Sequence, residues 1–377
     1  MHVRRSRSQS CLYACLIATL ACGGSSPAVQ IPAASAPSPA APAAEGRHAP
    51  VAPVALEEYF KIRRFGSRGG VLISFSHDEQ LVAYLNDEGG RADIWVQPVA
   101  GGEARQITRA DGFVHTLAFS PTSDVLVYEA DIGGDELPHL YLTDSKGSAP
   151  RDLTPQMPAG SRTMFADWAD DGKTFLYLSS ERDPKYLDLY EYDLAKNKAT
   201  RLWESSGKLS LSDGSRDHKR FILTETNTDA DSNLYLLERG STKPVLLTAH
   251  TGEVLHEPRG LSKDAKTLYL TSDAEGEFAA LYAMDLAKKT QKPVLKTDWD
   301  VEHAGFSHTF KYFLTTVNED GSFTLNVSDA GTKQTVKLPE APPGGAWFPI
   351  AWSVKDRYLG VRLQGDAGPS AGPSHQN

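Results

Sequence analysis

Three histidines stand at similar places in separate segments of this 377-residue chain. His115, His256 and His303 each lie four to six residues before a serine, and Glu257 and Glu302 stand beside two of them. Imidazole and carboxylate groups that meet in space bind divalent metals or polar ligands. If the segments surround one axis, these five side chains would form a ligand or metal site at its mouth. The alternative is a set of unrelated histidines on polar loops.

Two further segments match part of a known functional motif, but their flanking residues do not fit that motif. Residues 368–372 spell G-x-S-x-G around Ser370, but a nucleophile elbow needs a strand before the serine and a helix after it, and this one stands in a Gly/Pro tail. Residues 229–233 begin like a calcium loop, but Leu234 replaces the required glycine and Gly240 the final glutamate. We expect the first to be inert and the second to be a turn between strands.

The elements that must position these residues form a repeat. A short unit with an apolar residue, a serine, a polar turn and a β-rich run, first seen as I-S-F-S-H-D-E-Q-L-V-A-Y at 73–84, returns six times at spacings of 44 to 49 residues. Its landmark positions are Ser76, Ser120, Ala169, Ser215, Ser262, Ser307 and Ser353. So steady a period without helical patterning predicts an all-β, seven-bladed β-propeller.

Each repeat carries four predicted strands joined by Gly, Asp and Asn turns, which is one propeller blade. Six blades read as complete and the seventh as incomplete, because residues 365–377 hold three Gly, two Pro and no β-branched residue. The segment Glu57–Phe65 alternates well enough to be a strand that helps to close the ring. Even so, we expect one strand to be missing and a sheet edge to lie open, which favours pairing between molecules.

The N-terminal region has the pattern of an export signal. Residues 1–21 combine three arginines, an apolar run and a final small residue, and the run is too short to span a membrane. Residues 19–22 (T-L-A-C) resemble the lipobox of bacterial lipoproteins, which predicts lipid attachment at Cys22. The alternatives are cleavage before Cys15 or plain secretion with Cys22 as a free thiol. Residues 22–56 are rich in Pro, Ala and Ser and read as a disordered tether.

Charge and cysteine content limit the partners. The formal net charge is −9, and the first 21 residues contribute three of the positive charges, so the remainder is still more acidic. An acidic surface repels phosphate backbones, which excludes nucleic acid as a partner. All three cysteines lie within the first 22 residues, so the predicted domain at 57–364 holds together without disulfides.

The repeats resemble a known family. The stretches I-W-V-x-P-V-A-G-G-E-A-R-Q-I-T at 94–108 and L-D-L-Y-E-Y-D-L-A-K-N-K-A-T-R-L at 187–202 are similar to the propeller of the prolyl oligopeptidase family of serine peptidases, in its bacterial dipeptidyl- or acylaminoacyl-peptidase branch. TolB-like and tricorn-type propellers share the serine turn. The resemblance implies a propeller that limits access of short peptides to an α/β-hydrolase domain. No such domain is visible after residue 364, so we expect the propeller to lack a catalytic triad.

Three hypotheses follow. The first is a membrane-tethered, non-catalytic, substrate-gating propeller of a peptidase, truncated before its hydrolase domain. The second is a free-standing TolB-like lipoprotein that binds a peptide or protein at the channel mouth in the bacterial cell envelope, where its only membrane contact is the lipid on Cys22. The third is an enzyme acting through channel carboxylates or a metal, for which no constellation is visible. We assign no catalytic residue, metal or cofactor, and leave open whether the protein is an enzyme.

Overall fold

The computed structural model describes residues 73–88 and 90–365, and these form strands and turns without a helix. The predicted signal at 1–21, Cys22, the predicted tether at 22–56, the segment Glu57–Phe65 and Ser370 lie outside the described residues. Within the described part of the chain, no helix is long and apolar enough to cross a membrane.

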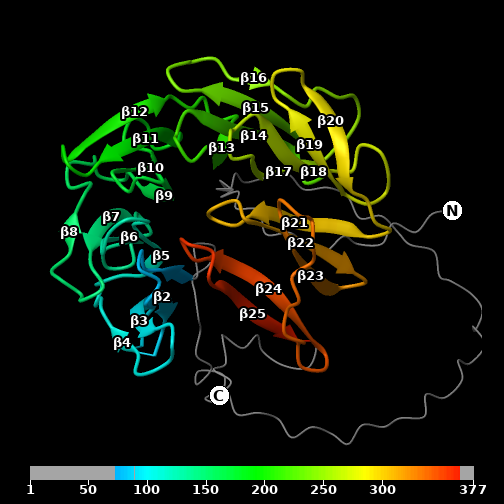
Figure 1. Cartoon of the computed structure of the whole chain (residues 1–377). Helices are drawn as coiled ribbons and strands as arrows, with labels where there is room; N and C mark the ends of the chain where they lie inside the picture. The colour runs from blue at the N-terminus through cyan, green and yellow to red at the C-terminus, as the bar shows by residue number, and fades with distance from the viewer. Residues whose placement is uncertain (1–72, 89, 366–377) are drawn as a thin grey trace, which may run out of the picture. The chain divides into compact units, whose positions relative to one another are not determined.

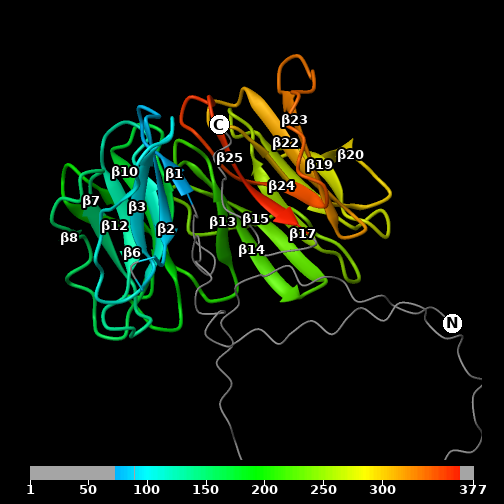
Figure 2. The ribbon, with the colours of Figure 1, turned by 90° about the horizontal axis from the view of Figure 1, so that it is seen from below.

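The strands form seven antiparallel sheets arranged as a ring (Figure 1), which confirms the predicted propeller. Each sheet runs in chain order from the middle of the ring outward, and Figure 2 shows the blades from the side. Blades 1 to 5 have four strands each: β1 Ile73–Phe75, β2 Leu81–Asn86, β3 Asp93–Pro98 and β4 Arg105–Gln106; β5 Val114–Phe119, β6 Leu126–Ala130, β7 His139–Thr143 and β8 Arg151–Asp152; β9 Thr163–Trp168, β10 Thr174–Ser179, β11 Asp188–Asp193 and β12 Lys198–Trp203; β13 Ser210–Gly214, β14 Arg220–Thr228, β15 Asp231–Glu238 and β16 Val245–Leu246; β17 His256–Leu261, β18 Thr267–Ser272, β19 Ala280–Asp285 and β20 Thr290–Leu295.

The last two blades are thinner. Blade 6 has β21 Asp300–Phe306, β22 Tyr312–Glu319 and β23 Ser322–Asp329, and its fourth position is held by a single bridge between Ser328 and Thr335. Blade 7 consists of β24 Gly345–Trp352 and β25 Leu359–Gly365, which pair with each other. Among the described residues no strand pairs with the outer edge of β25, in keeping with the predicted incomplete blade.

Each landmark serine organises a tight turn between the first and second strands, which we call the serine turn. Ser76 Oγ donates to Asp78 Oδ1 at 2.6 Å and accepts from the Leu81 N–H at 3.0 Å. The fourth residue of this turn adopts a positive φ in six of the seven blades, at Glu79, Gly172, His218, Ala265, Phe310 and Asp356. In blade 3 only glycine fits, because a Cβ on Gly172 would lie 2.1 Å from Thr122 Oγ1 of blade 2.

The hydrophobic core lies between blades rather than in one central mass. Successive clusters join neighbouring sheets, such as Leu176, Leu189 and Trp203 of blade 3 packed with Phe221 and Leu223 of blade 4. Alternating residues of each strand supply these contacts because one face of every sheet meets the next blade. A blade therefore depends on both of its neighbours.

Buried carboxylates form hydrogen bonds between the two-stranded seventh blade and both of its neighbours, blades 1 and 6. The fully buried Glu79 of blade 1 accepts from the Lys355 N–H at 2.6 Å and from the Arg357 guanidinium. On the other side, Asp356 accepts from Ser307 Oγ of blade 6 at 2.6 Å. Serine turns thus join blade 7 to blades 1 and 6, so two strands suffice to continue the ring.

Candidate functional site

The inner strands of blades 5 and 6 bring three of the five predicted side chains around a cation. Arg259 on β17 donates to Glu257 Oε2 at 2.6 Å and to Thr271 Oγ1 at 3.0 Å, and 13% of its side chain is exposed. The register of β17 shifts between Pro258 and Gly260, so Arg259 occupies a β-bulge. Bulges redirect side chains, which is how Arg259 comes to face the acids of two blades.

Blade 6 supplies the opposite wall of this cluster. Glu302 on β21 accepts from Asn318 Nδ2 at 3.1 Å, and its charge acts on Arg259. Although the His303 side chain is exposed, partial loss of solvent around it and then the charge of Arg259 lower its pKa below the ordinary 6.5, so its imidazole is neutral at pH 7. The group offers one guanidinium, two carboxylates and a neutral imidazole, and we call it the Arg259 cluster.

The other two predicted histidines lie elsewhere. His115 Nε2 lies 2.9 Å from Asp131 Oδ2 in blade 2. His256 is buried and packs edge-on against His250 at 5.1 Å, and burial lowers the pKa of His256 to about 4. No group of three His, Cys, Asp or Glu in the described part of the chain could hold a metal ion. The five predicted residues therefore do not form one ring-shaped site.

A second polar group lies at the serine turns and was missed by the sequence reasoning. Arg216 Nη1 of blade 4 lies 3.9 Å from Asp167 Oδ2 of blade 3, and Arg216 Nε lies 4.0 Å from Asp170 Oδ1. Burial and the nearby charge of Asp167 raise the pKa of Asp213 to about 6. Asp167 and Asp213 both stand two residues before a landmark position, a periodicity that could have pointed to them.

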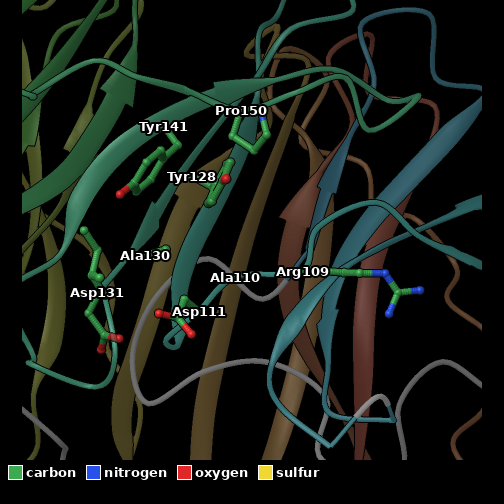
Figure 3. A pocket seen from close by; sticks show the side chains of 9 residues that line it. Arg109, Ala110, Asp111, Tyr128, Ala130, Asp131, Tyr141 and Pro150 are labelled. Carbon is green, nitrogen blue, oxygen red and sulfur yellow. The ribbon is translucent and has the colours of Figure 1, made fainter.

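A small cavity of about 190 Å³ lies beside blade 2, next to the segment 109–111 that leads into it from blade 1 (Figure 3). The stacked rings of Tyr128 and Tyr141, 5.3 Å apart, form one wall, and Asp111 and Asp131 lie at one end. Burial raises the pKa of Tyr128, which keeps its hydroxyl protonated.

The suspected calcium loop is a hairpin turn, as predicted. Residues 229–230 form the turn between β14 and β15, and Asp231 pairs across it with Thr228. The Asp231 carboxylate lies 2.8 Å from His250 Nε2 and accepts from Asn227 Nδ2 at 3.1 Å. These oxygens thus already have protein partners.

No protein-family model matches this chain. Comparison with individual proteins does find relatives. The chain is 27% identical over 246 residues to dipeptidyl aminopeptidase BIII of Pseudoxanthomonas mexicana, a match that takes in 62% of this chain and 34% of that protein. It therefore spans about a third of the length of this relative.

Among solved structures, a prolyl endopeptidase aligns with a TM-score of 0.59 at 15% identity, over 79% of this chain and 48% of that one. An oligogalacturonate lyase in complex with manganese aligns with a TM-score of 0.60 at 13% identity, over 81% and 88%. At such identities the structural matches establish the propeller fold alone. With the sequence match, they support a β-propeller of the kind found in the prolyl oligopeptidase family.

Proposed function

We propose that this chain is the non-catalytic propeller of a prolyl-oligopeptidase-like serine peptidase, and that it receives short peptides at the inner strands of its ring. The sequence similarity to a dipeptidyl aminopeptidase is the observation that supports this assignment most. The hydrolytic chemistry would belong to a separate hydrolase domain, and the propeller would govern which peptides reach it.

The Arg259 cluster is the part of the ring best suited to hold a peptide. A peptide presents a terminal carboxylate, a terminal ammonium and backbone amides. Arg259 can bind the first, Glu257 and Glu302 the second, and the neutral His303 can donate or accept a hydrogen bond. Because Arg259 is mostly buried, its charge is weakly screened by solvent.

Peptide binding without cleavage is the test. Calorimetry with di- to hexapeptides should show binding, and mass spectrometry should show intact peptides afterwards. Arg259→Gln should weaken binding by about tenfold or more, as loss of a charged hydrogen bond does. Arg239→Gln, which removes an ion pair with Glu191 between blades 4 and 3 rather than in the Arg259 cluster of blades 5 and 6, is the matched control and should bind normally. Equal affinity in Arg259→Gln, or no binding at all, would refute the proposal.

A second candidate is a free-standing binding propeller in the cell envelope, exported by residues 1–21 and anchored through a lipid on Cys22. The contacts of Glu79 with Lys355 and of Ser307 with Asp356 favour it, because they join blade 7 to both of its neighbours within the ring. Labelling cells with a radioactive fatty acid tests the anchor. Incorporation that Cys22→Ser abolishes supports the anchor, whereas unchanged incorporation contradicts it.

A further inference from the structure

The serine turns of non-adjacent blades meet across the ring. His308, in the turn that follows β21 of blade 6, places Nε2 3.7 Å from Oδ1 of Asp170, in the turn that follows β9 of blade 3. Blades 3 and 6 are separated by two blades on one side and three on the other. Figure 1 shows β9 and β21 on opposite sides of the middle of the ring. A contact between their turns therefore crosses the ring axis.

Blade 4 joins the same contact. The guanidinium of Arg216 lies 5.9 Å from the centre of the Phe310 ring of blade 6, while its nitrogens face Asp167 and Asp170 of blade 3. The Asp170 N–H also donates to the Arg216 carbonyl at 3.4 Å. Arg216 thus links one wall of the ring to the other by ionic, backbone and cation–π contacts.

These residues occupy equivalent positions in their repeats. Asp170, Arg216 and His308 each directly follow a landmark residue, so the repeat aims all three at the axis on the same face. Phe310 has a positive φ of 64°, and its ring contacts Phe306 at 5.3 Å, which holds it beside Arg216. The fold thus presents a cation, a carboxylate, an imidazole and an aromatic ring to one another from three blades.

We propose that Asp170, Arg216, His308 and Phe310 form a brace that closes the serine-turn face of the ring, so that a ligand reaches the inner strands from the opposite face. The brace sets the direction of access whatever the ligand is, and does not depend on the proposed peptide function. Its contacts are individually weak because their groups are partly exposed, so the brace can open without unfolding the blades.

A cross-link tests the geometry. In a chain whose Cys11, Cys15 and Cys22 are serines, the pair D170C and H308C should be joined by mild oxidation or a short bis-maleimide, which shifts mobility on a denaturing gel. The control pair K196C and H308C should not be joined, because Lys196 lies on the outer hairpin of blade 3. Absence of a D170C–H308C cross-link in folded protein would overturn the brace.

Thiol labelling tests closure in the same cysteine-free background. G305C is the reporter, since a Cβ there meets only His303 Nε2 at 3.8 Å and the Arg259 carbonyl at 3.9 Å, and it lies on the inner strand just before the serine turn of blade 6. A maleimide carrying a polyethylene glycol chain should react with it about tenfold faster when R216A and H308A remove the brace.

M164C is the control for the opposite face. Met164 is 42% exposed near the start of β9, and its labelling rate should stay constant with and without the brace. An unchanged rate for G305C in the folded double variant contradicts closure. If R216A with H308A fails to fold, the single F310A variant replaces it, and the cross-link stands as an independent measurement.

Discussion

Glu129 offers a sharp test of how the blades are joined. It lies on β6 with 6% of its surface exposed, and its carboxyl accepts the N–H of Phe165 on β9 of the next blade. Burial raises the pKa of Glu129 from 4.5 to about 8, against the opposing effect of this hydrogen bond. The carboxyl is therefore protonated at neutral pH in the folded protein.

The raised pKa of Glu129 makes the free energy of unfolding depend on pH. Below pH 4.5 the folded and unfolded chains both carry the proton, and the protein has its full stability. Between 4.5 and about 8 only the unfolded chain loses the proton, so the free energy of unfolding falls as pH rises, by about 1.4 kcal/mol per unit and about 5 kcal/mol in all. Glu129→Gln keeps an oxygen for the Phe165 N–H and removes the titration.

Urea unfolding of both proteins at pH 5, 7 and 9 measures this effect. The two should be similarly stable at pH 5, and Glu129→Gln should be more stable by several kcal/mol at pH 9. Parallel stability curves across this range would show that Glu129 is solvated and that the reasoning from burial is wrong.

Four further predictions follow from the same contacts. Glu79→Gln should have the opposite pH dependence. Burial raises the pKa of Glu79, but hydrogen bonds from Ser353, Lys355 and Arg357 outweigh burial and lower the pKa overall. Urea unfolding should therefore show that Glu79→Gln is less stable than the unchanged protein above pH 4.5, and that the difference disappears as the pH is lowered. Hydrogen bonds to the Thr248 carbonyl and then Asp231 raise the pKa of His250, so His250→Leu should cost stability at pH 6 and less at pH 9, as measured by urea titration. Gly172→Ala should lower stability in thermal unfolding by about 1–3 kcal/mol, because its Cβ would collide with Thr122 at a position with a positive φ. Gly240→Ala is the control: its Cβ meets no atom within 4 Å, so only the positive φ is unfavourable and the loss of stability should be smaller. Because β25 has no strand paired to its outer edge among the described residues, sedimentation at rising concentration should show self-association, and Val361→Lys should weaken it.

The order of the blades could be predicted from the sequence because the serine turn is a local structure. Ser76 contacts Asp78 and Leu81, which are two and five residues away, so each turn leaves its own mark on the sequence. Such marks locate the boundaries between first and second strands in six repeats, and the third repeat has Ala169 at the same position. The prediction that five histidine and glutamate side chains form one site was only partly correct. Glu257, Glu302 and His303 lie around Arg259, whereas His115 and His256 lie elsewhere.

The sequence by itself thus determined the all-β class, the period of the blades and the inner strands that carry the polar residues. The tertiary structure alone decided which of those residues meet. Arg259 faces two acids because of a bulge, and a bulge depends on the register between two strands. Asp170 and His308 meet because closing the ring turns two equivalent positions of distant repeats toward one axis. A periodic sequence specifies each repeat locally, but contacts across the ring depend on how many blades close it and how tightly they pack.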